Sequence, residues 1–236
     1  MDEETEDGLL GGAVRLRQPR RGFRAALDPV LLAAFVPARP GEAVLELGCG
    51  SGAAFLCLAA RVPGLRVAAI EQDPALAALA QRNAALNGVA ASVLAADLRG
   101  APLPRVRHGL ANPPYWPAGT ASPDPARRQA AHEAAALADW TAALGRAVVP
   151  RGTASLVLPA ARWGEAAALL RQSGFGALAL LPVAPREGEP AKRVLLRGVK
   201  AGRGPDRVLP PLVLHAGTGW APLAAAVLAG GAALPG

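Results

Sequence analysis

Residues 112–115, Asn-Pro-Pro-Tyr, have types and an order that suit the recognition of an aromatic amine. Two successive prolines fix two φ angles and remove two backbone donors, so the segment forms a stiff loop. The side-chain carbonyl of Asn112 and the backbone carbonyl of Pro113 can accept the two hydrogens of an exocyclic amine. Tyr115 offers a flat face on which a nucleobase can stack. Taken alone, the tetrapeptide is also compatible with a proline-rich turn that ends a strand.

A glycine-rich turn upstream indicates a ligand site. The apolar run 43–47 predicts a buried strand with a carboxylate, Glu46, near its end. Gly48, Gly50 and Gly52 follow at every second position. Glycine allows a sharp turn and lets a ligand lie against the backbone. The spacing departs from the G-x-G-x-x-G pattern of dinucleotide-binding proteins, so it disfavours NAD.

Carboxylates close the next two expected strands. Glu71 ends the strand 66–71, and Asp97 follows the strand 91–96. A carboxylate at the tip of the second strand can accept hydrogen bonds from both hydroxyls of a ribose. Together with the glycine turn, these acids predict a nucleoside pocket at the carboxyl edge of a parallel sheet. The pocket is acidic, which suits a cationic ligand such as a sulfonium.

These motifs resemble, in order and spacing, those of class I S-adenosylmethionine-dependent methyltransferases of the amino-methylating branch. The segments 20–33 and 190–196 further resemble the bacterial tRNA (adenine-N(6))-methyltransferases that act beside the anticodon. In that family the strand before the tetrapeptide often carries an aspartate, whereas residues 107–111 here contain no acid. The resemblance implies methyl transfer from S-adenosylmethionine to the amine of an adenine in tRNA.

The resemblance also implies roles for individual residues. The expected catalytic residues are Asn112, Pro113 and Tyr115. The expected cofactor-binding residues are Glu46, Gly48, Gly50, Gly52, Glu71, Asp97 and Leu98.

The net charge of +7 favours a polyanionic partner, and tRNA is the expected one. Basic residues gather in an N-terminal hairpin and at the start of a late strand, and Trp116 lies beside the tetrapeptide. We expect this set to contact RNA: Arg15, Arg17, Arg20, Arg21, Arg24, Trp116, Lys192 and Arg193. The alternative for the arginines is a solvated strand face.

Other functional classes receive no support from the sequence. Cys49 and Cys57 do not suggest a disulfide, and the spacing of metal ligands is absent, so we expect no metal. The acidic N-terminus is unlike a secretory signal, and no apolar segment has membrane-spanning length. We therefore expect a cytoplasmic protein without a membrane partner. The sequence makes no prediction of oligomeric state.

The alternation of apolar strands and helices predicts an α/β protein. We expect a Rossmann-like, seven-stranded, mostly parallel sheet with helices on both faces and one antiparallel strand from a C-terminal hairpin. Residues 1–8 carry five acids, so they predict a disordered tail. Residues 9–200 would form the methyltransferase domain with its basic hairpin. Residues 201–236 would form a loop-rich extension on or beside the domain, with a packing helix in 221–234.

Other acceptors and another class of function remain open at this stage. The same tetrapeptide serves a related family that methylates a protein glutamine amide, but that family carries a separate helical N-terminal domain. Here the residues before 43 predict a hairpin and one helix. A guanine amine of ribosomal RNA is another candidate acceptor. The chain could also be a non-catalytic RNA-binding protein, although such a protein does not need the glycine turn, Glu71 and Asn112 together.

Overall fold

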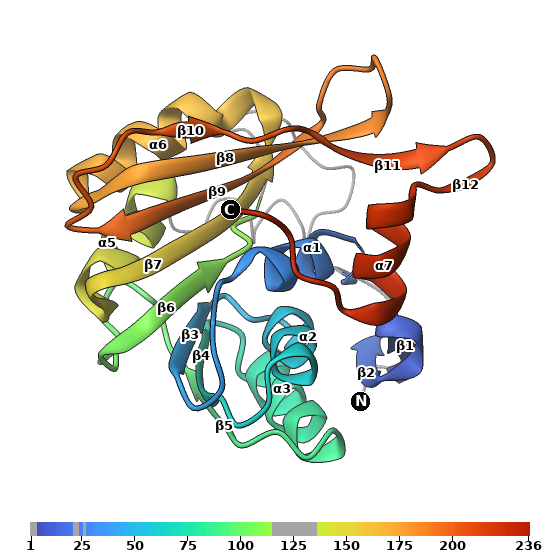
Figure 1. Ribbon diagram of the computed structural model, residues 1–236. Helices are drawn as coiled ribbons and strands as arrows, with labels where there is room; N and C mark the ends of the chain where they lie inside the picture. Colours follow the sequence, from blue (N-terminus) through green and yellow to red (C-terminus); the bar gives the residue numbers. More distant parts are fainter. Residues whose placement is uncertain (1–3, 21–23, 26, 115–135) are drawn as a thin grey trace, which may run out of the picture.

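A mixed sheet with helices on both faces forms the body of the protein (Figure 1). The computed structural model describes residues 4–20, 24–25, 27–114 and 136–236. Within these residues the main sheet has ten strands, and a separate sheet has two.

Seven strands of the main sheet have the predicted Rossmann-like arrangement. Along the sheet their order is β5-β4-β3-β6-β7-β9-β8. The antiparallel strand is β9, which pairs with β7 and β8, as the predicted hairpin requires. The bounds are β3 (Ala43–Leu47), β4 (Arg66–Glu71), β5 (Ala91–Ala95), β6 (Val106–Ala111), β7 (Val148–Pro159), β8 (Phe175–Arg186) and β9 (Arg193–Lys200).

The helices form two layers because the sheet has two apolar faces. One core cluster joins the sheet to α1 (Leu27–Phe35), α2 (Ala53–Arg61), α3 (Pro74–Leu86) and α7 (Pro222–Gly230). The other joins the opposite face to α5 (Leu137–Ala147) and α6 (Trp163–Gln172). Short 3₁₀ turns occupy Leu10–Gly12 and Ala160–Arg162. None of the helices that the structure describes is long and apolar enough to span a bilayer.

The prediction of a disordered segment at residues 1–8 is wrong for residues 4–8. They belong to β1 (Glu4–Leu9), which pairs antiparallel with β2 (Val14–Pro19). Glu6, one of the acids that suggested disorder, faces arginines across the hairpin. Glu6 accepts hydrogen bonds from Arg15 at 2.8 Å and from Arg17 at 3.3 Å. Opposite charges across paired strands stabilise the pairing, so the acidic composition of this segment does not prevent it from folding.

The C-terminal segment has more regular structure than the loop-rich extension predicted. The strands β10 (Arg207–Val208) and β11 (Leu212–Ala216) both pair parallel with β8, and β12 (Gly219–Trp220) pairs with β11. The helix α7 then lies within the predicted helical stretch 221–234. These strands widen the main sheet beyond the seven predicted.

Asn83 of α3 and Asn87, the residue that follows α3, attach the N-terminal hairpin to the body of the protein. The fully buried Asn83 accepts a hydrogen bond from the Arg17 N–H at 3.0 Å and donates to the carbonyls of Arg17 and Ser51. One turn later, the half-buried Asn87 bonds in the same way to the N–H and carbonyl of Arg15. The hairpin is therefore held by side-chain amides that replace a missing neighbouring strand.

We expect Asn83→Ala to lower the free energy of unfolding by about 2 kcal/mol, because it leaves buried backbone groups without partners. Asn87→Ala is the matched control and should lower it by less than about 1 kcal/mol, because water can replace the lost bonds at a half-exposed site. Urea unfolding of the two variants measures the difference. Equal losses would show that the burial of Asn83 does not matter.

Candidate active site

The glycine turn lies at the carboxyl end of β3 and is packed against α5. The backbone of Gly48 has a φ of 59°, in the left-handed region that favours glycine. A Cβ at Gly48 would lie 2.3 Å from Cη2 of Trp140, so the indole packs directly on this backbone. Trp140 is buried, and sequence reasoning did not single it out. Its position depends on how α5 packs on the sheet, which the spacing of the glycines does not reveal.

Gly50 marks the open side of the same turn. Its φ is 54°, and a Cβ built on it would have no other atom within 4 Å. Gly50 therefore presents bare backbone to open space, where a side chain would project into a bound ligand. This is the arrangement that a cofactor lying against the turn requires.

Glu46 contacts the buried side of the turn and does not line its open side. The side chain is buried, and its Oε2 accepts a hydrogen bond from the Phe55 N–H in the first turn of α2 at 2.8 Å. Burial raises the pKa of Glu46 to about 8; the Phe55 N–H opposes this shift, and the nearby Glu71 adds to it. Glu46 thus links the strand before the turn to the helix after it.

Glu71 reaches the turn from the neighbouring strand. One carboxylate oxygen accepts a hydrogen bond from the Gly50 N–H at 2.8 Å, and the other accepts one from the Asp73 N–H at 3.0 Å. The register places Ile70 opposite Leu47, and the Cys49 N–H donates to the Ile70 carbonyl. The structure therefore brings the predicted ribose-binding carboxylate to the open side of the glycine turn.

Asp97 and Leu98 lie just beyond β5, which ends at Ala95. Asp97 pairs with Arg99 through several hydrogen bonds, which lower the pKa of its carboxyl group. Leu98 is buried, and its carbonyl accepts a hydrogen bond from Arg146 at 3.0 Å. The chain of Asp97 thus stands at the carboxyl edge, but its charge is neutralised by an arginine two residues later.

Asn112 directly follows β6, which ends at Ala111, and lies beside the glycine turn. The register pairs Ala111 of β6 with Leu47 of β3, so Asn112 and Gly48 start neighbouring loops. Pro113 is buried and Pro114 is exposed. Tyr115, Trp116 and Arg21, which the sequence assigned to the site, lie outside the described residues.

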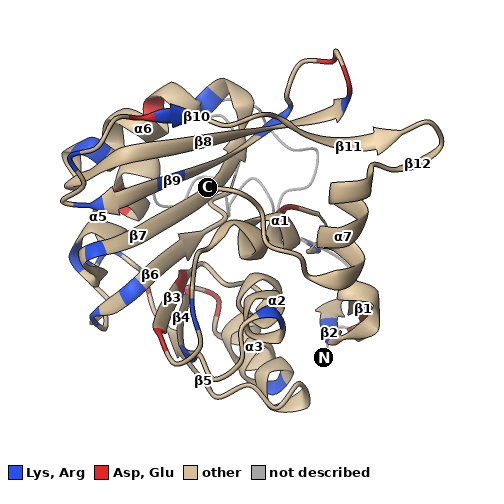
Figure 2. Ribbon diagram, in the orientation of Figure 1, with Lys and Arg blue, Asp and Glu red and all other residues tan. Residues whose placement is uncertain are grey.

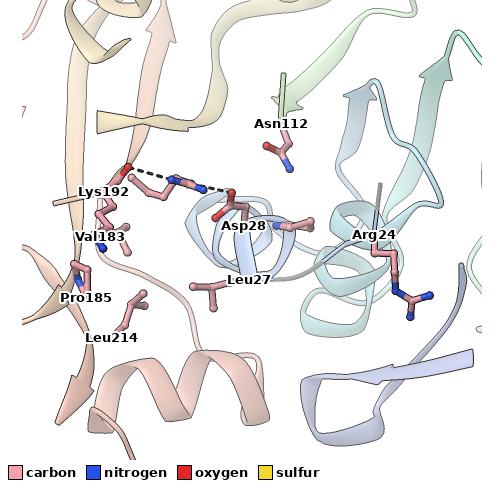
Figure 3. Close-up of a pocket in the computed structure, with 10 residues that line it drawn as sticks. Arg24, Leu27, Asp28, Asn112, Val183, Pro185, Lys192 and Leu214 are labelled. Atoms are coloured by element: carbon pink, nitrogen blue, oxygen red, sulfur yellow. Dashed lines mark hydrogen bonds and ion pairs between the residues drawn. The ribbon is translucent and has the colours of Figure 1, made fainter. Parts of the chain in front are cut away.

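A cavity of about 330 Å³ opens beside Asn112 (Figure 3). Its polar lining comes from three distant parts of the chain, and the apolar remainder includes Val183 and Leu214. Sequence reasoning did not assign Asp28 to the site, so its place in this lining was not predicted. The cavity is large enough for a planar base. Its polar residues are Arg24, Asp28, Asn112, Lys192 and Arg193.

The predicted RNA-binding residues divide into two groups. Lys192 and Arg193, at the start of β9, line the cavity with Arg24. Arg15 and Arg17 lie on the exposed face of β2, where Glu6 pairs with both. Arg24 itself pairs with Asp7 at 2.5 Å. The acids of β1 therefore offset much of the positive charge that the sequence assigned to the hairpin.

The positive charge of the protein is not concentrated at the cavity. Figure 2 shows several Lys and Arg residues around the ends of β6 and β7, away from α1. Arg105 and Arg107 belong to this region. Burial lowers the pKa of the Lys200 amine, and the positive charge of the nearby Arg105 lowers it further. The net charge alone thus does not locate an RNA-binding face.

Metal and disulfide chemistry have no visible basis in this part of the chain. Cys49 and Cys57 are free and buried. Among the residues that the structure describes, no group of three or more His, Cys, Asp and Glu side chains is placed to hold a metal ion.

The protonation of Glu46 makes a prediction about stability and pH. Its folded-state pKa of about 8 lies above the ordinary 4.5. Between these values the unfolded chain loses the proton while the folded protein keeps it, so stability falls as pH rises through this window. Glu46→Gln removes the titration and keeps an acceptor for Phe55. We expect its stability relative to the parent to increase steadily from about pH 5 to about pH 8 in urea unfolding.

Glu165→Gln is the control, because Glu165 is half-exposed and its pKa is lowered by Arg162. Both folded and unfolded states have this group ionised above about pH 6, so its effect should be constant there. A Glu46→Gln difference that stays flat with pH would contradict a raised pKa.

Comparison with known proteins identifies the family. A family model described as a methyltransferase domain matches residues 44–111. A tRNA1(Val) (adenine(37)-N6)-methyltransferase of Aeromonas hydrophila is 33% identical over 205 residues, covering 85% of this chain and 86% of that protein. One from Dickeya chrysanthemi is 34% identical over 187 residues, covering 75% of this chain and 73% of that protein. The crystal structure of a predicted O-methyltransferase from Agrobacterium tumefaciens superposes with a TM-score of 0.73 and 28% identity, covering 88% of this chain and 98% of the other. The chain is therefore an S-adenosylmethionine-dependent methyltransferase and belongs to the tRNA1(Val) (adenine(37)-N6)-methyltransferase family.

Proposed function

We propose that this protein methylates the exocyclic amine of the adenine beside the anticodon of a tRNA. The observation that carries the proposal is the placement of Asn112 next to the glycine turn, since β6 and β3 are paired up to Ala111 and Leu47. In this proposal, the side chain that accepts a hydrogen of the amine and the turn that holds the cofactor follow adjacent strand ends. The names of the relatives support tRNA as the substrate.

The residues present fit S-adenosylmethionine. Gly50 offers open backbone, and Glu71 stands beside it with a carboxylate that can bind a ribose. Glu46 and Trp140 act through the turn, because they hold its backbone from the buried side. Asp97 and Leu98 would border the far end of the same site. When bound, S-adenosylmethionine supplies an activated methyl group on a sulfonium sulfur.

The acceptor residues must make a weak nucleophile attack in the correct direction. The lone pair of an adenine amine is delocalised into the ring. The Asn112 side-chain carbonyl and the Pro113 backbone carbonyl would accept its two hydrogens and favour the pyramidal, more nucleophilic nitrogen. Holding the amine in line with the methyl group can contribute roughly 7–11 kcal/mol to the lowering of the barrier. Tyr115 would stack on the base. The reaction needs no separate general base, because the proton can leave to water after transfer.

The remaining predicted contacts concern the RNA backbone. Lys192 is exposed at the rim of the cavity, which suits a phosphate. The exposed arginines on and just after β2 are Arg15, Arg17 and Arg20. A phosphate would bind Arg15 and Arg17 in competition with Glu6, which pairs with both. Arg21, Trp116 and the half-buried Arg24 complete the proposed surface. A tRNA substrate would place the enzyme in the cytoplasm.

Asn112→Ala tests the chemistry. It removes the side-chain acceptor and should lower the turnover number by about two orders of magnitude, the scale of one lost transition-state hydrogen bond. Affinity for S-adenosylmethionine should remain close to that of the parent, since Asn112 follows a strand end instead of holding the turn. Single-turnover methyl transfer to tRNA and calorimetric titration of the cofactor give the two readouts. Full turnover in the variant would contradict the assigned role.

Gly50→Ala tests the cofactor site and has a matched control. Gly41 also has positive φ, 81°, and also has open space around a Cβ, but it lies before β3 at the other end of the strand. Both substitutions should lower stability by about 1 kcal/mol through backbone strain. Only Gly50→Ala should also weaken cofactor binding, by at least about tenfold, because its Cβ enters the ligand's space. Equal cofactor affinity in both variants would show that the ligand does not lie against Gly50.

A further inference from the structure

The cavity beside Asn112 contains an ion pair that the proposed methyl transfer does not explain. Nε of Arg193 lies 3.1 Å from Oδ2 of Asp28. Arg193 is the first residue of β9, and Asp28 lies in the first turn of α1. Figure 3 marks this contact with a dashed line that ends at Asp28, near Asn112. An ion pair between such distant parts of the chain, at the site of reaction, calls for a role.

The pair fixes the orientation of the guanidinium group. Its Nη1 also donates to the Lys192 carbonyl, at 3.3 Å. The Lys192 N–H in turn donates to the Val183 carbonyl of β8, at 3.1 Å, which anchors this backbone to the sheet. Because a guanidinium is planar, holding Nε and Nη1 fixes the plane of the whole group. Arg193 is therefore oriented before any substrate binds.

The surroundings of Arg193 suit a neutral acceptor better than a phosphate. The Asp28 carboxylate beside it would repel a second anion, and it neutralises the charge that would attract one. The side chain of Asp28 is 19% exposed and that of Arg193 is 39% exposed, so water screens the pair only in part. Lys192, one residue earlier, is exposed and is the better phosphate ligand. A group with a neutral nitrogen acceptor is the complement of Arg193.

Adenine has such acceptors on both sides of its amine. The ring nitrogen N1 is bonded to the carbon that carries the amine, N7 lies one atom further away on the other side of the amine, and both accept hydrogen bonds. With the amine held by Asn112 and Pro113, one flanking nitrogen would face the wall of the cavity that Arg193 lines. Guanine bound in the same orientation would bring its O6 carbonyl toward the two carbonyl acceptors, which would repel it, and its N1 carries a hydrogen and cannot accept one from Arg193.

Building on the proposed function, we propose that Arg193 recognises the target base by donating a hydrogen bond to the ring nitrogen beside the methylated amine. Asp28 is the positioning residue that orients Arg193 for this contact. The pair would thus determine that the base is an adenine, and would act on the base edge instead of on the RNA backbone.

The test combines protein variants with altered bases. Three synthetic anticodon stem-loops carry adenosine, 1-deazaadenosine or 7-deazaadenosine at the target position. Each deaza base lacks one ring nitrogen. The proteins are the parent, Arg193→Met, Asp28→Asn and the control Arg66→Met. Arg66 is exposed and is the first residue of β4, so it lies at the amino ends of the parallel strands, whereas Asn112 and the cavity lie at their carboxyl ends. The readout is kcat/KM for methyl transfer with S-adenosylmethionine.

The parent and Arg66→Met should lose kcat/KM by about tenfold to about 100-fold on one of the two deaza substrates, the range of one hydrogen bond to a charged donor. Arg193→Met should lose a similar factor on adenosine and should no longer distinguish that deaza substrate from adenosine. Deaza substitution also changes the reactivity of the amine, but equally for every protein, so only the difference between variants reports the contact. Asp28→Asn should retain part of the discrimination, because it weakens the orientation of Arg193 without removing the donor.

The inference would be overturned if Arg193→Met lowered kcat/KM on adenosine and each deaza base then lowered it further by the same factor as in the parent. The inference would also be overturned if neither deaza base lowered kcat/KM of the parent by more than it lowers that of Arg193→Met. Unchanged cofactor affinity and melting temperature in Arg193→Met exclude a folding defect. A parent protein that methylates no adenosine stem-loop and no tRNA would instead contradict the proposed function itself.

Discussion

The site depends on the way two glutamate side chains hold one glycine turn. Glu46 accepts from Phe55 behind the turn, and Glu71 accepts from Gly50 in front of it. A turn of glycines is entropically costly to order, and these bonds, with Trp140 packed on Gly48, fix it in one conformation. The parallel pairing of β3 with β4 and β6 then sets where Glu71 and Asn112 can stand. The loops proposed to hold the cofactor and the target amine lie side by side because they begin at neighbouring strand ends.

Elements outside the central strands are attached to this turn by polar contacts. Asn83 joins the N-terminal hairpin to Ser51, within the turn itself. Asp28 and Arg193 join α1 to β9 across the cavity. The N-terminal hairpin is therefore connected to the glycine turn through the buried Asn83, so a change at one can shift the geometry of the other.

Much of the central fold could be predicted from the sequence, because local patterns specify it. The apolar runs around Glu46 and Glu71 gave strands at 43–47 and 66–71, as found. The prediction failed where structure depends on distant partners. The acids of β1 suggested disorder, but one of them, Glu6, pairs with Arg15 and Arg17 across a hairpin. Trp140 and Asp28 take part in the site through helix packing and a contact across 165 positions, which spacing does not encode.

The most direct test of the central claim is the identity of the methylated product. Bulk tRNA from cells lacking the relevant modification is incubated with the protein and S-adenosylmethionine carrying a labelled methyl group, then digested and separated as nucleosides. The structure and its relatives predict that the label appears in N6-methyladenosine. Label in a ring-methylated adenosine or in a guanosine would contradict the assignment of Asn112 and Pro113 as acceptors of an adenine amine.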